Sequence, residues 1–121
     1  MPDVYTLPAG REMDALVAVM LGCHPEPFDE LFSGQVSYAC RCNGGAHGDI
    51  LGVRRYSTDP GSAFLVLDEL RNTGHTYHVY GGLHDFAVEI RRGLVEHLAE
   101  TRDRSLPLAI CRAALIAVAV K

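Results

Sequence analysis

Apolar residues recur at helical spacing near both ends of the chain. In residues 11–21 they fall on one face of the expected helix, and Gly22 is placed to end it. Residues 106–120 differ, because they are apolar almost all the way round and contain a single charge, Arg112. A helix buried on more than one side needs a second packing layer, which another subunit can supply in so short a chain. We therefore expect a homo-oligomer whose interface includes this helix.

A further helix is expected between these two. Ser57 or Thr58 can cap its beginning, Asp59 lies beside the positive end of its dipole, and Pro60 fits its first turn. Residues 72–74, with the sequence Asn-Thr-Gly, are expected to end it.

Three later segments have the alternation of β-strands. Residues 75–80 and 85–90 are joined by a glycine-containing turn, and residues 94–100 follow as a third strand. The order α, β-hairpin, α, β, β, β, α predicts an α+β fold with a small antiparallel sheet sandwiched between helices. Residues 1–121 are expected to form a single domain.

A long irregular insertion is predicted at about residues 23–53, which are rich in glycine and proline. Residues 36–40 and 50–53 are candidate strands of a short hairpin within it. The insertion also contains residue types that bind zinc. The set is Cys23, Cys40, Cys42 and His47. Because Cys-x-Cys replaces the usual Cys-x-x-Cys, a loop with free thiols is favoured over zinc, and no cofactor is expected.

Composition excludes some classes of partner. The chain has 121 residues, 48% of them hydrophobic, and a net charge of −4, so a nucleic-acid partner is not expected. The last apolar run is shorter than the roughly 20 residues of a membrane span, which favours a core helix and no membrane partner. No export signal is expected, and the four cysteines indicate a reducing cytoplasm.

Four sequence strings resemble the phage ABA-sandwich domain family. They are residues 11–18, Tyr-Ser-Thr-Asp at 56–59, Phe-Ala-Val-Glu-Ile at 86–90 and the helix segment 106–115. The similarity covers nearly the whole chain except residues 23–53. In one branch of similar phage proteins, the members act as sponges against Thoeris immunity. They bind cyclic ADP-ribose signals without cleaving them, in pockets shared between subunits, and some also hold cyclic oligonucleotides.

The resemblance implies two ligand-binding positions. An aromatic residue on the sheet and an arginine on the last helix hold the ligand in similar proteins, and the matching positions here are Phe86 and Arg112. A planar guanidinium can bind a phosphate through two hydrogen bonds. The alternative for Arg112 is a structural ion pair, for example with Glu89 or Asp85.

Three more residues are candidates for ligand binding. Arg55 precedes the second helix, whose N-terminus can bind an anion, but a capped helix with solvated arginines is the alternative. His78 and Tyr80 belong with Phe86 to an aromatic patch on the predicted hairpin. Such a patch can stack on a base, or it can pack in a core or interface.

The sequence contains none of the common catalytic motifs, so we expect a binding protein and not an enzyme. The leading hypothesis is a phage anti-defence sponge. It would sequester a cyclic nucleotide immune signal, such as a cyclic ADP-ribose isomer, without cleaving it. The alternative is a small phage accessory protein that acts through protein–protein contacts and has no small-molecule ligand.

Overall fold

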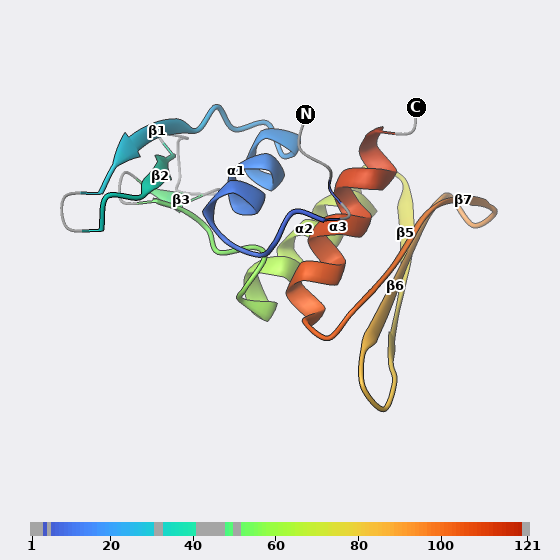
Figure 1. Ribbon diagram of the computed structural model, residues 1–121. Helices are drawn as coiled ribbons and strands as arrows, with labels where there is room; N and C mark the ends of the chain where they lie inside the picture. The colour runs from blue at the N-terminus through green and yellow to red at the C-terminus, as the bar shows by residue number, and fades with distance from the viewer. Residues whose placement is uncertain (1–3, 5, 31–32, 41–47, 50–51, 120–121) are drawn as a thin grey trace.

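The computed structural model describes residues 4, 6–30, 33–40, 48–49 and 52–119. Within them the chain has an α+β fold in which helices flank small antiparallel sheets, which confirms the predicted fold class (Figure 1). The helices are α1 (Arg11–Met20), α2 (Pro60–Asn72) and α3 (Leu106–Ala119). The main sheet is a meander of β5 (His75–Gly81), β6 (Phe86–Arg92) and β7 (Glu96–Asp103).

The helices and the main sheet form successive layers. Helices α2 and α3 pack on the sheet, and α1 packs on α3 at the side away from the sheet (Figure 1). Most of α3 is buried between these neighbours, including Ala109, Ile110 and Cys111. The second packing layer that its apolar sequence requires is therefore supplied within the chain. The homo-oligomer stays a prediction.

The alternation along the strands sets which side chains reach the core. Val88 and Ile90 of β6 are fully buried in the hydrophobic core, whereas Glu89 lies between them on the opposite face. Strand β7 pairs with β6 through a bulge beside Ile90 and Arg91. Near the end of β7, the buried Thr101 hydroxyl donates to the Ala109 carbonyl at 2.7 Å, which joins the sheet to α3.

The described residues of the insertion form two local hairpins instead of the one expected. Strand β1 (Glu26–Asp29) pairs with β2 (Val36–Ala39), and β3 (Gly48–Asp49) pairs with β4 (Gly52–Val53). The predicted pairing of residues 36–40 with 50–53 is wrong, because each segment pairs with its nearer neighbour. Closing a shorter loop costs less conformational entropy.

The N-terminal cap of α2 differs from the prediction. The cap of α2 is Asp59, whose carboxylate accepts from the Ser62 amide at 3.1 Å, and not Ser57 or Thr58. Ser57 is instead fully buried and donates its amide and hydroxyl to one carboxylate oxygen of Asp14, at 2.7 and 2.6 Å. This contact fixes the segment before α2 against α1.

No helix in the described part of the chain is both long and apolar enough to cross a bilayer. This agrees with the prediction that residues 106–120 form a core helix.

Candidate functional site

Arg112 has protein partners in this structure. Its Nη1 lies 3.1 Å from a carboxylate oxygen of Asp103, and its Nη2 donates to the Leu7 carbonyl at 2.9 Å. Its Nε is buried and has no hydrogen-bond partner among the described residues. Arg112 was expected either to bind a ligand phosphate or to form a structural ion pair. The structure contains a partner for the ion pair. That partner is Asp103, and not the expected Glu89 or Asp85.

Asp103 lies at the end of β7. Its carboxylate accepts from the Ser105 amide at 2.8 Å with one oxygen and from Arg112 with the other. Phe86 is half-buried and is the cross-strand neighbour of Asp103. The predicted ligand residues Phe86 and Arg112 are therefore both neighbours of Asp103, the first across the strands and the second through its side chain.

The other predicted ligand residues lie elsewhere. His78 and Tyr80 are stacked, with ring centroids 6.1 Å apart, and both are exposed on β5. Their neighbour Tyr77 packs against the core, so the predicted aromatic patch is divided between the two faces of the sheet. Arg55 is exposed and lines a hollow of about 320 Å³ together with Asp14 and others near α1 and β2.

A larger hollow of about 670 Å³ lies where the three helices end. Its walls come from the C-terminal ends of α1, α2 and α3 and from the adjoining ends of β5 and β6. The apolar side chains that line it are Met20, Leu21, Leu70, Ala117 and Val118. The polar ones are Glu69, Thr73, His75 and Arg92. This volume and an apolar wall with few polar groups are typical of small-molecule sites.

Negative and positive groups lie on different sides of this large hollow. Helix C-termini carry partial negative charge and carbonyl groups that accept hydrogen bonds, which suits hydroxyl and amino groups of a ligand. The positive charge comes from the sheet, where Arg92 lies directly opposite His75 in the β5–β6 pairing. His75 Nδ1 lies 3.1 Å from the Leu70 carbonyl, which orients the imidazole ring. An anionic group therefore fits beside Arg92 and away from the helix ends.

The two arginines differ in how easily they could bind a ligand anion. Arg92 pairs with Glu96 at 3.2 Å, and their side chains are 46% and 54% exposed. Such a surface pair contributes at most about 1 kcal/mol. The pair of Arg112 and Asp103 has exposures of only 14% and 27%. Breaking a pair this sheltered costs several times more, in the range of about 3–5 kcal/mol for buried pairs.

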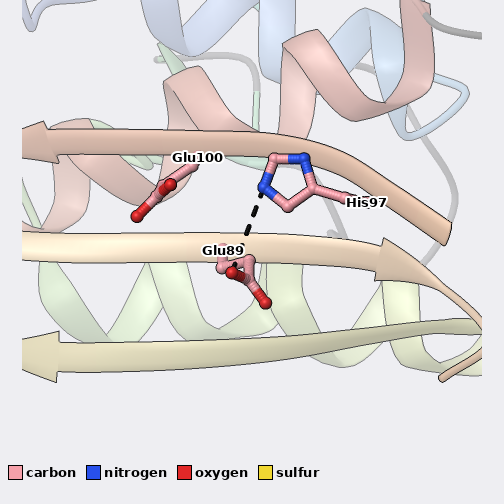
Figure 2. A group of neighbouring side chains, drawn as sticks. All are labelled: Glu89, His97 and Glu100. Atoms are coloured by element: carbon pink, nitrogen blue, oxygen red, sulfur yellow. Dashed lines mark ion pairs between the residues drawn. The ribbon is translucent and has the colours of Figure 1, made fainter. Parts of the chain in front are cut away.

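Glu89, His97 and Glu100 form a group on the face of the main sheet away from the helices (Figure 2). Glu89 and Glu100 are cross-strand partners, and one ligand atom from each of the three residues lies within 4.8 Å of the others. Arg91 Nε contacts a Glu89 oxygen at 2.6 Å, and the His97 Nε2 lies 4.0 Å from the other oxygen. Arg91 thus already neutralises the most sheltered carboxylate, which makes the group an ion-pair network on the sheet.

Two of the four sequence candidates for zinc binding come together. Cys23 and Cys40 are 17 positions apart, and their sulfur atoms lie 3.2 Å from each other in the core. The other two candidates, Cys42 and His47, lie outside the described residues. Cys111 is also buried, and its burial raises the pKa of its thiol far above the ordinary value.

Comparisons with protein-family models, with curated proteins and with solved structures found no match to this chain.

Sequence reasoning missed the large hollow and its residues His75 and Arg92. His75 lies in a predicted strand and Arg92 lies just after one, but neither was identified as a candidate binding residue. The available signal was their position. His75 begins the strand that follows the predicted end of α2, and Arg92 comes just after the next predicted strand. Cross-strand pairing then makes them neighbours.

Proposed function

We propose that this protein is a phage anti-defence sponge that captures a cyclic nucleotide signal, such as a cyclic ADP-ribose isomer, without cleaving it. The resemblance of the sequence to the phage ABA-sandwich family suggests this class of ligand. The observation that carries the proposal is the hollow of about 670 Å³ at the helix ends, which combines an apolar wall with an accessible arginine. Burial in such a hollow supplies the slow release that a sponge needs.

The ligand is assigned to this hollow because of the difference between the two arginines. Arg92 takes the phosphates, because its present pair with Glu96 is exposed and weak. The apolar wall formed by Leu21, Leu70 and Val118 packs against the base. Glu69 and the helix-end carbonyls accept hydrogen bonds from the ribose hydroxyls. Arg112 then has a structural role, although the resemblance implies a ligand-binding one.

The test is isothermal titration calorimetry of the full chain with cyclic ADP-ribose isomers. We expect one isomer to bind tightly. The Arg92→Ala substitution removes a charge-assisted hydrogen bond worth about 1.5–3 kcal/mol, so the dissociation constant should rise by about 10- to 100-fold. Ligand released by heating the complex should be chemically intact, since capture involves no bond cleavage.

A matched control is Arg102→Ala. Arg102 is also an exposed sheet arginine, with a carboxylate partner, Asp85, at 3.8 Å, but it does not line the hollow. Its loss should leave the affinity unchanged. Absence of heat with every isomer would refute the proposed ligand. Loss of binding in a folded Arg112→Ala protein, with Arg92→Ala unaffected, would instead place the ligand at the residues expected from the resemblance.

A second function is favoured by exposed apolar residues at the turn between β6 and β7. Leu94 and Val95 are 81% and 86% exposed, which is unusual for adjacent large apolar side chains and typical of a protein contact. This agrees with the alternative of an accessory protein that acts through protein–protein contacts. Under this alternative, exchange of both residues for serine would abolish binding of the partner protein. Under the sponge proposal, the same exchange would leave ligand capture intact.

A further inference from the structure

The small hollow of about 320 Å³ lies where the beginning of α1 meets β2 and β4. It is separate from the large hollow, because Gly10 and Arg11 line the small one, whereas Met20 and Leu21 line the large one. Helix α1 has 10 residues and is therefore about 15 Å long. The two hollows thus lie at opposite ends of this helix.

Four charged residues line the small hollow, and two of them have no ion-pair partner. Arg11 and Glu30 neutralise each other, with a guanidinium nitrogen and a carboxylate oxygen 2.8 Å apart. Asp14 and Arg55 are the other two, and they form no ion pair with each other or with any other described residue. The hollow therefore presents one unpaired group of each sign, and the two groups do not meet.

Asp14 is a buried carboxylate with one unused oxygen. The residue is only 4% exposed. Its Oδ1 accepts both hydrogen bonds from Ser57, whereas its Oδ2 has no hydrogen-bond partner among the described residues. A buried charge is costly unless it is paired and hydrogen-bonded. A cationic donor in the small hollow would supply the partner that Oδ2 lacks.

The beginning of α1 provides groups of the opposite kind. Its N-cap is Gly10, which has no side chain to accept hydrogen bonds from the first turn. The amides of Arg11 and Glu12 have no acceptor among the described residues. Free amides at a helix N-terminus bind carboxylates and phosphates, and the exposed Arg55 adds a positive charge at the same hollow. An anionic group therefore fits between the start of α1 and Arg55.

We propose that the small hollow binds a small α-amino acid, with its ammonium group at Asp14 Oδ2 and its carboxylate between the start of α1 and Arg55. A zwitterion satisfies both unpaired charges at once, which neither a simple anion nor a simple cation does. The volume lies at the lower end of the roughly 300–1,000 Å³ of ligand sites, so the ligand is small. Tyr38 and Thr58 also line the hollow, and their hydroxyl groups suit a polar side chain. This site is independent of the proposed capture of a cyclic nucleotide.

The experiment is a titration of the full chain with glycine, L-alanine, L-serine and L-threonine, followed by backbone amide shifts. We expect at least one of them to bind, with the largest changes at Arg11, Glu12 and Arg55. Two probes separate the charges of serine, since ethanolamine lacks its carboxylate and 3-hydroxypropionate lacks its ammonium group. Each loses one charge-assisted contact and should bind at least about tenfold more weakly than serine.

The substitutions Asp14→Asn and Arg55→Gln should each raise the dissociation constant by about 10- to 100-fold. Asp14→Asn retains an acceptor for Ser57, and Arg55 is exposed, so both variants should fold, which circular dichroism checks. The matched control is Arg104→Gln, because Arg104 is also exposed but does not line the hollow. Its affinity for the amino acid should be unchanged.

Three results would overturn the proposal. The first is the absence of shift changes with all four amino acids at millimolar concentration. The second is equal binding of serine and 3-hydroxypropionate, because the site would then hold an anion alone. The third is amino-acid binding that folded Asp14→Asn and Arg55→Gln proteins both retain, because the ligand would then lie elsewhere.

Discussion

The contact between Asp14 and Ser57 gives a sharp prediction about stability. Both residues are buried, and one Asp14 oxygen accepts from the Ser57 amide and hydroxyl. In Asp14→Ala the Ser57 amide loses its acceptor, and the Ser57 hydroxyl keeps only its longer contact with the Gly10 carbonyl, at 3.4 Å. Each buried donor left unsatisfied costs about 1–3 kcal/mol, so the total loss is about 3 kcal/mol. This is a large share of the roughly 5–15 kcal/mol by which a domain is stable.

The variant Asp14→Asn separates the hydrogen bonds from the charge. Its side-chain carbonyl can accept the same two donors, and the new amide group can meet water in the hollow that Asp14 lines. Burial raises the pKa of Asp14 above its ordinary value of 3.8, although Ser57 partly opposes this by stabilising the carboxylate. The folded state therefore retains the Asp14 proton to a higher pH than the unfolded state does.

The pH dependence follows from this difference. The contribution of Asp14 to stability falls as the pH rises from 3.8 through its raised pKa in the folded state, and Asp14→Asn lacks this contribution. We therefore expect Asp14→Asn at pH 7 to be as stable as the wild type or more stable. The assay is urea unfolding followed by circular dichroism, at pH 7 and at an acidic pH where all three proteins stay folded. If Asp14→Asn were as unstable as Asp14→Ala at pH 7, the reasoning would be wrong.

Three further substitutions test the contacts that hold the fold, each by urea unfolding at pH 7. Asp59→Ala removes the cap of α2 and should cost about 1 kcal/mol, whereas Asp68→Ala, on the exposed surface of the same helix, should change little. Thr101→Val removes the buried hydrogen bond to α3 and should cost about 1–3 kcal/mol; an unchanged midpoint would show that this bond is not needed. Arg112→Leu leaves Asp103 without its sheltered partner and should cost about 3 kcal/mol, while a stable, ligand-free Arg112→Leu protein would favour a binding role for this arginine.

The helices and the main sheet could be predicted from the sequence because their signals are local. The alternation of Val88, Glu89 and Ile90 shows which face is buried, and the helical periods lie within single segments. The cap of α2 was assigned wrongly because a contact between distant residues decides it. Ser57, Thr58 and Asp59 all have suitable side chains, and only the distant Asp14 removes Ser57 from that role.

The candidate site could not be predicted in the same way. The hollow exists because three helix ends and two strand ends converge, and no local pattern records that convergence. Asp103 lies between two arginines in the sequence, and only the fold shows that its partner is the more distant Arg112. For Cys23 and Cys40 the residue types were recognised, but only the fold shows that their sulfur atoms meet.

The most direct test of the proposed function is to locate the ligand by nuclear magnetic resonance. The measurement follows backbone amide shifts of the full chain during titration with the cyclic ADP-ribose isomer that binds. The account predicts that the largest changes lie around the hollow, at Leu21, Thr73, His75, Arg92 and Val118. Changes confined to the surroundings of Phe86 and Arg112, or no changes at all, would contradict it.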